Sequence, residues 1–243
     1  MSSEILMEML ILAGGFGTRL KAAVHDVPKP MASINGTPLL NLQIDHWIRQ
    51  GQRSFVFLLH HQADLIIDFL VAKSKKLGEY INITWIVEET PLGTGGSVSH
   101  AIHKNNLTGD VLIANADTWL TGGLDQLSRS KGAAIAVIQS SDTSRYGSIV
   151  MDKNYFLIKF VEKNVNLGNE NSGLINAGLY KLPTSIFHSE KTKEFSLETE
   201  ILPQMSSKKL LKAEVLNGIF FDIGVPEDYY KFCEWYQINE KNE

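Results

Sequence analysis

The sequence predicts a doubly wound α/β fold, because short apolar segments alternate with amphipathic segments through its first half. The apolar segments contain few polar residues, which is typical of strands that are buried on both faces of a sheet. The amphipathic segments supply the helical crossovers that join parallel strands. We expect strands at Met7–Ala13, Phe55–Leu59, Ile83–Val87, Val111–Asn115 and Ala133–Ile138, and helices at Leu39–Gln50, Gln62–Lys76, Gly95–His103 and Gly123–Ser130.

The second half of the chain predicts a smaller region that is rich in strands. Tyr146–Met151 and Phe156–Val161 flank the turn residues Asp152-Lys153-Asn154 and form a predicted hairpin. Ser196 and Pro226 are residue types that favour the first positions of helices. We expect further strands at Ile175–Leu182 and Leu210–Val215, helices at Pro183–Ser189, Ser196–Ser206 and Pro226–Ile238, and a loop, a candidate flap, at Asn164–Ser172.

No linker divides the chain. It has 243 residues, of which 44% are hydrophobic, and α/β chains of this size often form one domain around a large core. There is no internal repeat, no low-complexity tract and no stretch rich in Pro, Gly and Ser. We therefore expect a single domain over residues 1–243 with a mixed sheet.

Charge and composition exclude several classes of partner. The net charge is -4, from 23 basic and 27 acidic residues, and no lysine-rich run forms a local basic patch. Binding to nucleic acid through its phosphates is therefore not expected. The N-terminus has no basic segment before an apolar core, and Met7–Leu12 is too short to span a membrane. We expect a cytoplasmic protein without a membrane partner.

Cysteine and histidine give no metal or redox centre. The single cysteine, Cys233, excludes an intrachain disulfide and a cysteine-based zinc cluster, and its aromatic neighbours in a predicted helix favour a packed thiol over a nucleophile. Among the histidines, only His100 and His103 share a helix face, and they lack a third ligand. We interpret all seven as structural: His25, His46, His60, His61, His100, His103 and His188.

A glycine loop follows the first predicted strand and indicates a site for polyphosphate. The order is Leu12-Ala13-Gly14-Gly15-Phe16-Gly17-Thr18-Arg19-Leu20, then Pro28-Lys29-Pro30. Glycines let the backbone approach an anion and expose successive N–H groups to it, and two cations neutralise the remaining charge. The spacing matches neither a P-loop nor a dinucleotide-binding turn. The alternative, a tight turn without a ligand, does not explain the nearby Arg19 and Lys29.

Two aspartates stand at positions suited to a metal ion. Asp117 follows the predicted strand Val111–Asn115 after one residue, Ala116, and Asp222 lies in a similar setting near the C-terminus. Ligands of open parallel sheets bind beyond the carboxyl ends of the strands. Because Mg²⁺ in proteins takes one or two carboxylates with phosphates and waters, these residues form a candidate magnesium site. The alternative for Asp117 is a helix cap.

These motifs resemble the signature of the sugar-phosphate nucleotidyltransferases, which has LAGGxGTRL, then PKP, then PLGTxG. Here Pro91-Leu92-Gly93-Thr94-Gly95-Gly96 matches the third motif, and Ala116 departs from the glycine that more often precedes the first metal acid. The resemblance implies a Rossmann-like, GT-A-like fold with a small β-rich sugar-binding subregion. It further implies that residues 1–140 mainly bind nucleotide and residues 141–243 mainly bind the sugar phosphate.

The resemblance also implies roles for individual residues. Arg19, Lys29 and Asp117 would be catalytic, and Asp117 and Asp222 would hold Mg²⁺. The nucleotide would be bound by Leu12, Ala13, Gly14, Gly15, Gly17, Thr18, Arg19, Lys29, Glu88, Gly93, Thr94 and Asn115. The sugar phosphate would be bound by Tyr146, Gly147, Glu162, Lys163 and Asn176.

The implied substrates are a nucleoside triphosphate and a sugar 1-phosphate, which give an NDP-sugar and pyrophosphate. Phe195-Ser196-Leu197-Glu198 and the segment from Phe221 to Tyr229 resemble the D-glycero-D-manno-heptose 1-phosphate guanylyltransferases, which serve capsules, O-antigens or S-layer glycans. Mannose, glucose, glucosamine or N-acetylmuramic acid 1-phosphate with GTP, UTP, CTP or dTTP is an alternative. So is a non-catalytic regulatory subunit, although such chains tend to lose the Arg, Lys or metal acid. The resemblance is compatible with a homo-oligomer.

Glu88 predicts which nucleobase the nucleoside triphosphate carries. A carboxylate only accepts hydrogen bonds, which suits the N1–H and N2–H donors of guanine and does not suit uracil or thymine. Glu88 therefore favours GTP. The alternative is that Glu88 is a solvated acid beside Glu89.

Overall fold

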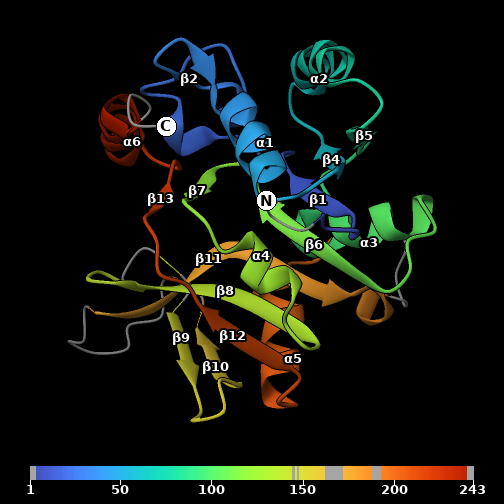
Figure 1. The fold of residues 1–243 in the computed structure, drawn as a ribbon, viewed down its shortest axis with the longest axis vertical. Coiled ribbons are helices and arrows are strands. Elements are labelled where there is room, and N and C mark those ends of the chain that lie inside the picture. The colour runs from blue at the N-terminus through green and yellow to red at the C-terminus, as the bar shows by residue number, and fades with distance from the viewer. Residues whose placement is uncertain (1–3, 144–145, 147, 162–171, 188–192, 240–243) are drawn as a thin grey trace.

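The computed structural model describes residues 4–143, 146, 148–161, 172–187 and 193–239, and its centre is a sheet of parallel strands (Figure 1). The strand β1 (Met9–Leu12) lies between β4 (Ser54–Leu59) and β6 (Asp110–Asn115), and β5 (Asn82–Val87) pairs with β4 at the edge. All three pairings are parallel. The doubly wound α/β fold is confirmed.

The other end of the sheet is largely antiparallel. β11 (Gly173–Pro183) runs antiparallel to β6 and to β8 (Ala133–Ser140), and β12 (Leu211–Val215) joins β8 in parallel. The predicted hairpin forms β9 (Ser148–Met151) and β10 (Leu157–Val161). Because β11 lies between β6 and β8 and is antiparallel to both, β8 runs in the same direction as β6, as expected for Ala133–Ile138, but it pairs in parallel only with β12 and not with the first four strands.

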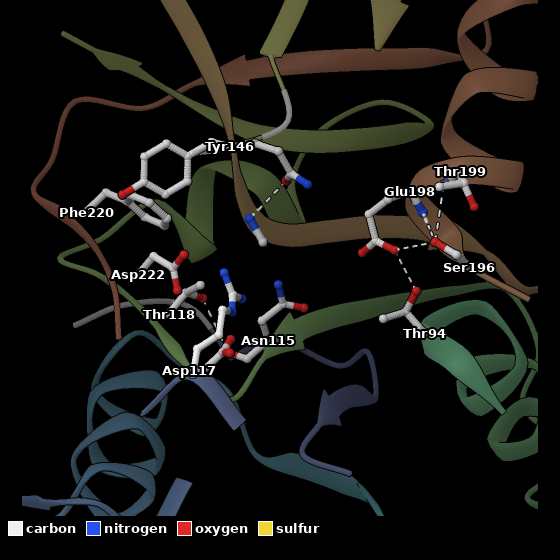
Figure 2. A pocket seen from close by; sticks show the side chains of 13 residues that line it. Thr94, Asn115, Asp117, Thr118, Tyr146, Ser196, Glu198, Thr199, Phe220 and Asp222 are labelled. Atoms are coloured by element: carbon white, nitrogen blue, oxygen red, sulfur yellow. Dashed lines mark hydrogen bonds between the residues drawn. The ribbon is translucent and has the colours of Figure 1, made fainter. Parts of the chain in front are cut away.

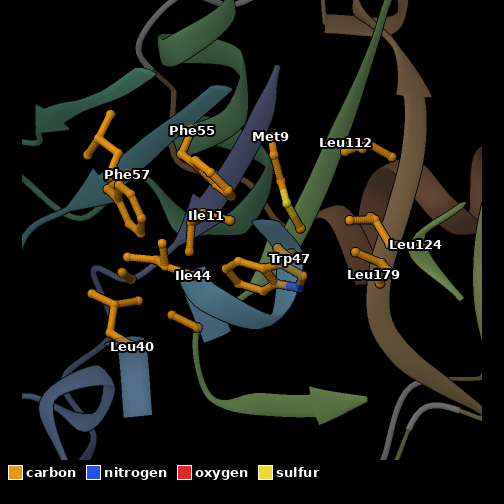
Figure 3. Close-up of a cluster of buried hydrophobic side chains, with 14 of the residues drawn as sticks. Met9, Ile11, Leu40, Ile44, Trp47, Phe55, Phe57, Leu112, Leu124 and Leu179 are labelled. Atoms are coloured by element: carbon orange, nitrogen blue, oxygen red, sulfur yellow. The ribbon is translucent and has the colours of Figure 1, made fainter. Parts of the chain in front are cut away.

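Helices cover both faces of the sheet because side chains alternate along its buried strands. In β1, Met9 and Ile11 face one layer and Leu10 faces the other. The first layer consists of α1 (Leu39–Arg49), α2 (Ala63–Leu77) and α4 (Leu124–Ser128), and Figure 3 shows Leu40, Ile44 and Trp47 of α1 packed on the strands. The second layer contains α3 (Gly93–Lys104) and α5 (Leu202–Ser207).

Two predicted helices differ from the structure. For Pro183–Ser189, β11 continues to Pro183 and a 3₁₀ turn at Thr184–Phe187 follows, while residues 188–189 lie outside the described part. In Ser196–Ser206, Ser196 caps the N-terminus as predicted, but Leu197–Ile201 is a π-helical turn before α5. Pro203 explains the change of helix type, because proline has no N–H to donate to the preceding turn.

A third cluster of buried side chains lies beside the sheet, around α6 (Pro226–Asn239). Phe232 of this helix packs on Trp119 with ring centroids 5.2 Å apart. Tyr229 donates a 2.6 Å hydrogen bond to the carbonyl of Ser33, in β2 (Ser33–Ile34), which pairs with β3 (Thr37–Pro38).

Burial raises the pKa of Tyr229 to about 12 and also raises the pKa of the Cys233 thiol. A raised pKa disfavours the thiolate, in agreement with a packed thiol.

No helix among the described residues is both long and apolar enough to cross a bilayer.

Candidate active site

The glycine loop leaves the carboxyl end of β1 and is held between neighbouring elements. The N–H of Ala13 donates to Leu58 at 3.0 Å, and that of His61 donates to Gly14 at 3.4 Å. Gly17 has φ of 63°, and a Cβ there would lie 3.1 Å from Cγ of Lys29. Glycine at this position therefore lets the loop turn and lets the stem of Lys29 pack against it. Short 3₁₀ turns follow at Thr18–Leu20 and Lys29–Met31.

Lys29 points to the first of the two acids. Its Nζ lies 2.7 Å from Oδ2 of Asp117; the Lys29 side chain is largely buried and that of Asp117 is partly exposed. Asp117 lies two residues beyond the end of β6, and the N–H of the intervening Ala116 donates to the carbonyl of Leu12 at 3.1 Å. Ala116 itself is buried in the core, so its methyl group is accommodated where the family more often has glycine.

A short ladder brings the second acid to the first. β7 (Thr118–Leu120) pairs antiparallel with β13 (Phe220–Asp222), with Asp222 opposite Thr118. The N–H of Ile223 also donates to the carbonyl of Asp117 at 2.8 Å. Asp117 and Asp222 consequently line one cavity. Two carboxylates that are completed by phosphates and waters are a set of ligands that would fit Mg²⁺. The described residues contain no cluster of three or more His, Cys, Asp or Glu that could hold a metal by itself.

The cavity that contains both acids has a volume of about 330 Å³. Figure 2 shows Asp117, Asn115 and Asp222 on one side of it and Glu198 with Thr94 on the other. Seven predicted site residues from different parts of the chain meet here: Arg19, Thr94, Asn115, Asp117, Tyr146, Asn176 and Asp222. Gly147, Glu162 and Lys163, which were predicted for the sugar phosphate, lie outside the described residues.

A second cavity, of about 270 Å³, adjoins the first through Thr94, Asn115 and Asp117, which line both. Most of the residues predicted to bind nucleotide line it: Leu12, Gly14, Gly15, Glu88, Gly93, Thr94 and Asn115. Gly17 and Lys29 line a neighbouring cavity of about 290 Å³. Ala13 is buried beneath the loop, and Thr18 lines none of these three cavities.

Glu88 is a buried carboxylate on the wall of the second cavity. Its side chain is 8% exposed, so the alternative of a solvated acid was wrong. Oε2 accepts a 3.1 Å hydrogen bond from the N–H of Leu92 and thereby holds the turn before α3. His60 Nδ1 lies 3.0 Å from the carbonyl oxygen of Glu88, and His60 also lines this cavity.

The glycines of the second motif have a packing role. Gly93 has φ of 69°, and a Cβ there would lie 2.6 Å from the carbonyl oxygen of Phe195. At Gly95 a Cβ would lie 2.3 Å from the ring of Phe195. The family resemblance implies that glycine here lets the base approach. In the structure, these two positions allow the chain around Phe195 to close on α3, and Gly93 also lines the second cavity.

The close approach of the chain around Phe195 to α3 also brings into the first cavity several residues for which no role was predicted. Oε2 of Glu198 accepts hydrogen bonds from Thr94 at 2.6 Å and from Ser196 at 2.8 Å. Thr199 and Phe220 also line the cavity. The Phe195–Glu198 segment carried a family resemblance in the sequence, but a capping serine before acids is typical of any helix start.

Asn176 is held in place by an irregularity of β11. Its Oδ1 accepts from the N–H of Gly178 at 2.9 Å, and its Nδ2 donates to the hydroxyl of Tyr180 at 2.7 Å. Gly178 has φ of 69°, and a Cβ there would lie 2.7 Å from Nδ2 of Asn115. This bulge lets β11 come close to the end of β6, so that Asn176 and Asn115 face one cavity.

A glycine loop, two cations and two carboxylates at the carboxyl edge of a doubly wound sheet define an α/β enzyme that handles phosphates. The chain belongs to the nucleotidyl transferase family, whose sequence model matches residues 8–237.

Comparison with individual proteins gives close relatives. The chain is 35% identical over 230 residues to the D-glycero-alpha-D-manno-heptose 1-phosphate guanylyltransferase of Campylobacter jejuni, covering 93% of this chain and 98% of that enzyme. It is 36% identical over 232 residues to a probable mannose-1-phosphate guanylyltransferase of Oryza sativa, covering 92% of this chain and 63% of the rice protein. The structure of HddC from Yersinia pseudotuberculosis complexed with GMP-PN matches with a TM-score of 0.81 and 33% identity, over 95% of this chain and 100% of that one.

Proposed function

We propose that this protein is a sugar 1-phosphate guanylyltransferase that joins GTP to D-glycero-D-manno-heptose 1-phosphate, releasing GDP-heptose and pyrophosphate. The observation that carries the proposal is that two adjoining cavities meet at Asp117, beside Lys29. A nucleotide in the second cavity and a sugar phosphate in the first would bring their phosphates together there. The Campylobacter relative, matched over almost its whole length, supports the heptose. Cytoplasmic supply of a bacterial surface glycan is part of this proposal.

The proposed reaction needs placement and charge neutralisation more than proton transfer. The attacking phosphate oxygen is already an anion at neutral pH, so no general base is required. Arg19 would hold the β- and γ-phosphates, and Lys29 would bridge the α-phosphate and the sugar phosphate. The ammonium of Lys29 has three N–H donors, and Asp117 accepts one of them. Mg²⁺ held by Asp117 and Asp222 would polarise the α-phosphate.

The sugar would lie in the first cavity between the two halves of the chain. Tyr146 and Asn176 come from the second half, and Arg19 and Asn115 from the first. We propose that, within one domain, residues 141–243 supply the sugar side of this cavity and residues 1–140 its phosphate side, where Arg19 would hold the β- and γ-phosphates. Glu198 adds a carboxylate acceptor for sugar hydroxyls, oriented by Thr94 and Ser196.

A pyrophosphate-release assay that crosses GTP, UTP, CTP and dTTP with a panel of sugar 1-phosphates tests the function. We expect the highest kcat/KM for GTP with D-glycero-D-manno-heptose 1-phosphate. A maximum with mannose 1-phosphate would make the protein resemble the rice relative in substrate and would refute the heptose assignment. No turnover with any pair would favour a regulatory subunit.

Base selection is expected to depend on Glu88. The Glu88→Gln substitution keeps an oxygen for the N–H of Leu92 but replaces an acceptor with an amide donor. A site that hydrogen-bonds one base leaves a buried group unpaired with another. The ratio of kcat/KM for GTP to that for UTP should therefore fall by at least roughly tenfold, which is about 1.4 kcal/mol.

Glu89→Gln is the matched control for this prediction, because Glu89 is the exposed neighbour of Glu88 and lines none of the three cavities. It should leave the GTP to UTP ratio unchanged. If Glu88→Gln leaves the ratio unchanged as well, base selection lies in backbone contacts of the Gly14–Gly17 and Gly93–Gly95 loops.

A further inference from the structure

Gln43 of α1 is buried directly beneath the turn that carries Asp117. Its side chain is 1% exposed. Nε2 donates a 2.6 Å hydrogen bond to the carbonyl of Thr118 and lies 3.5 Å from that of Asn115. These carbonyls stand on either side of Asp117, so one amide bridges the two ends of the turn.

The same helix holds the next part of this segment. Nε2 of His46 lies 2.9 Å from the carbonyl oxygen of Leu120, and its ring stacks on Trp119 at 4.7 Å between centroids. Thr118, which accepts from Gln43, is paired with Asp222 in the β7–β13 ladder. A shift of Thr118 would therefore move both acids of the candidate metal site.

Packing alone does not explain an amide at this position. Oε1 of Gln43 is buried, and no group among the described residues donates to it. A buried acceptor without a donor is unfavourable. The neighbouring Leu40, Ile44 and Trp47 already anchor α1 to the sheet through apolar contacts (Figure 3). The donor side of Gln43, directed at the Asp117 turn, is the part that an apolar residue could not supply.

We propose that Gln43 is a positioning residue that fixes the carboxylates of Asp117 and Asp222 for the metal ion. This inference rests on the proposed metal role of the two acids. It adds a residue that touches neither substrate nor metal and acts through the carbonyls of Asn115 and Thr118. Hydrogen-bond partners behind the ligands of a metal typically change its affinity by about 10–100-fold when they are removed.

The chain contains a matched control in Gln52. This glutamine is 0% exposed, its Nε2 donates to the carbonyls of Met7 at 2.9 Å and Ser54 at 2.6 Å, and its Oε1 also has no donor among the described residues. Met7 precedes β1 and Ser54 begins β4, so Gln52 lies at the amino ends of these strands. The active site lies at the opposite ends. Gln43 and Gln52 thus share their local chemistry and differ in location.

The test compares Gln43→Met with Gln52→Met, because methionine keeps the length of the side chain without its amide. Both variants should lose thermal stability to a similar degree. Mn²⁺ binding to the protein is measured from the loss of the free-ion signal in electron paramagnetic resonance, and the Mg²⁺ concentration for half-maximal rate from pyrophosphate release. In Gln43→Met we expect the dissociation constant for Mn²⁺ and the Mg²⁺ concentration for half-maximal rate each to rise by about tenfold or more. In Gln52→Met both should match the wild type.

Equal values in Gln43→Met and the wild type, or equal changes in the two variants, would overturn the positioning role. Asp117→Asn in the same assays tests the underlying proposal separately: unchanged Mn²⁺ binding and Mg²⁺ requirement there would refute the metal site whatever Gln43 does. If a methionine variant does not fold, Gln43→Asn and Gln52→Asn replace the pair, since asparagine keeps an amide but is too short to reach both carbonyls. The same outcomes then apply.

Discussion

Replacing Lys29 by alanine should lower kcat/KM on the order of 10²–10³-fold and leave the fold intact. Its Nζ is the cation nearest to the first metal acid, 2.7 Å from Asp117, at the place where the two cavities meet. In the proposed reaction, its removal takes away the donor that would bridge the attacking and the attacked phosphate and neutralise part of their charge. Arg19→Ala should have an effect of the same order, because Arg19 lines the first cavity and is exposed to it.

The ion pair with Asp117 makes the expected result more specific. Without Lys29, the carboxylate of Asp117 loses a competing cation, so Mn²⁺ binding to the protein should be no weaker than in the wild type. Turnover measured by pyrophosphate release should nevertheless fall. A loss of turnover together with weaker metal binding would mean that Lys29 only maintains the geometry of Asp117.

Lys21→Ala is the matched control for both substitutions. Lys21 is exposed and lies between Arg19 and Lys29 in the sequence; it lines the cavity of about 290 Å³ with Lys29 but neither of the two adjoining cavities in which the reaction is proposed. Its removal changes the net charge by the same amount, so a change of about threefold or less is expected from screened surface electrostatics. Wild-type turnover in Lys29→Ala or Arg19→Ala would remove that residue from the mechanism.

The parallel half of the fold could be predicted from sequence because its strands are apolar and separated by amphipathic helices. Side-chain alternation in β1 and the burial of α1 follow directly from that pattern. The position of β8 could not be predicted, because strand composition does not say that β11 enters antiparallel beside β6. Strands as short as β7 and β13 carry no periodicity, although their ladder sets the geometry of the site.

The residues of the candidate site also fall into those that the sequence could predict and those that it could not. Residues in contiguous motifs, such as Gly14 and Thr94, could be predicted and do line the adjoining cavities. The position of Glu198 in the site could not be predicted, since it depends on how closely the chain around Phe195 approaches α3. Gln43 could not either, because a lone glutamine in an amphipathic helix gives no sign of the backbone carbonyls it will meet.

Asp117→Asn and Asp222→Asn should each lower turnover strongly and raise the Mg²⁺ concentration required for half-maximal rate. Asp222 lies opposite Thr118 in the β7–β13 ladder, and both acids line one cavity, so a single ion can take one oxygen from each. Asparagine keeps the size of the side chain and removes its charge. Because residues that act as a unit are not additive, the double variant should be little slower than the slower single variant.

Asp110→Asn controls for the loss of an acid on the same strand. Asp110 begins β6, at the end opposite to Asp117, and lies 3.4 Å from Nζ of Lys181. Because Lys181 is buried, losing its ion pair with the partly exposed Asp110 should lower stability, whereas the Mg²⁺ requirement should stay unchanged. If the losses in Asp117→Asn and Asp222→Asn multiply in the double variant, the two acids act independently. In that case only one of the two acids can be a ligand of the catalytic metal. The other acid would have a separate role, such as orienting the sugar.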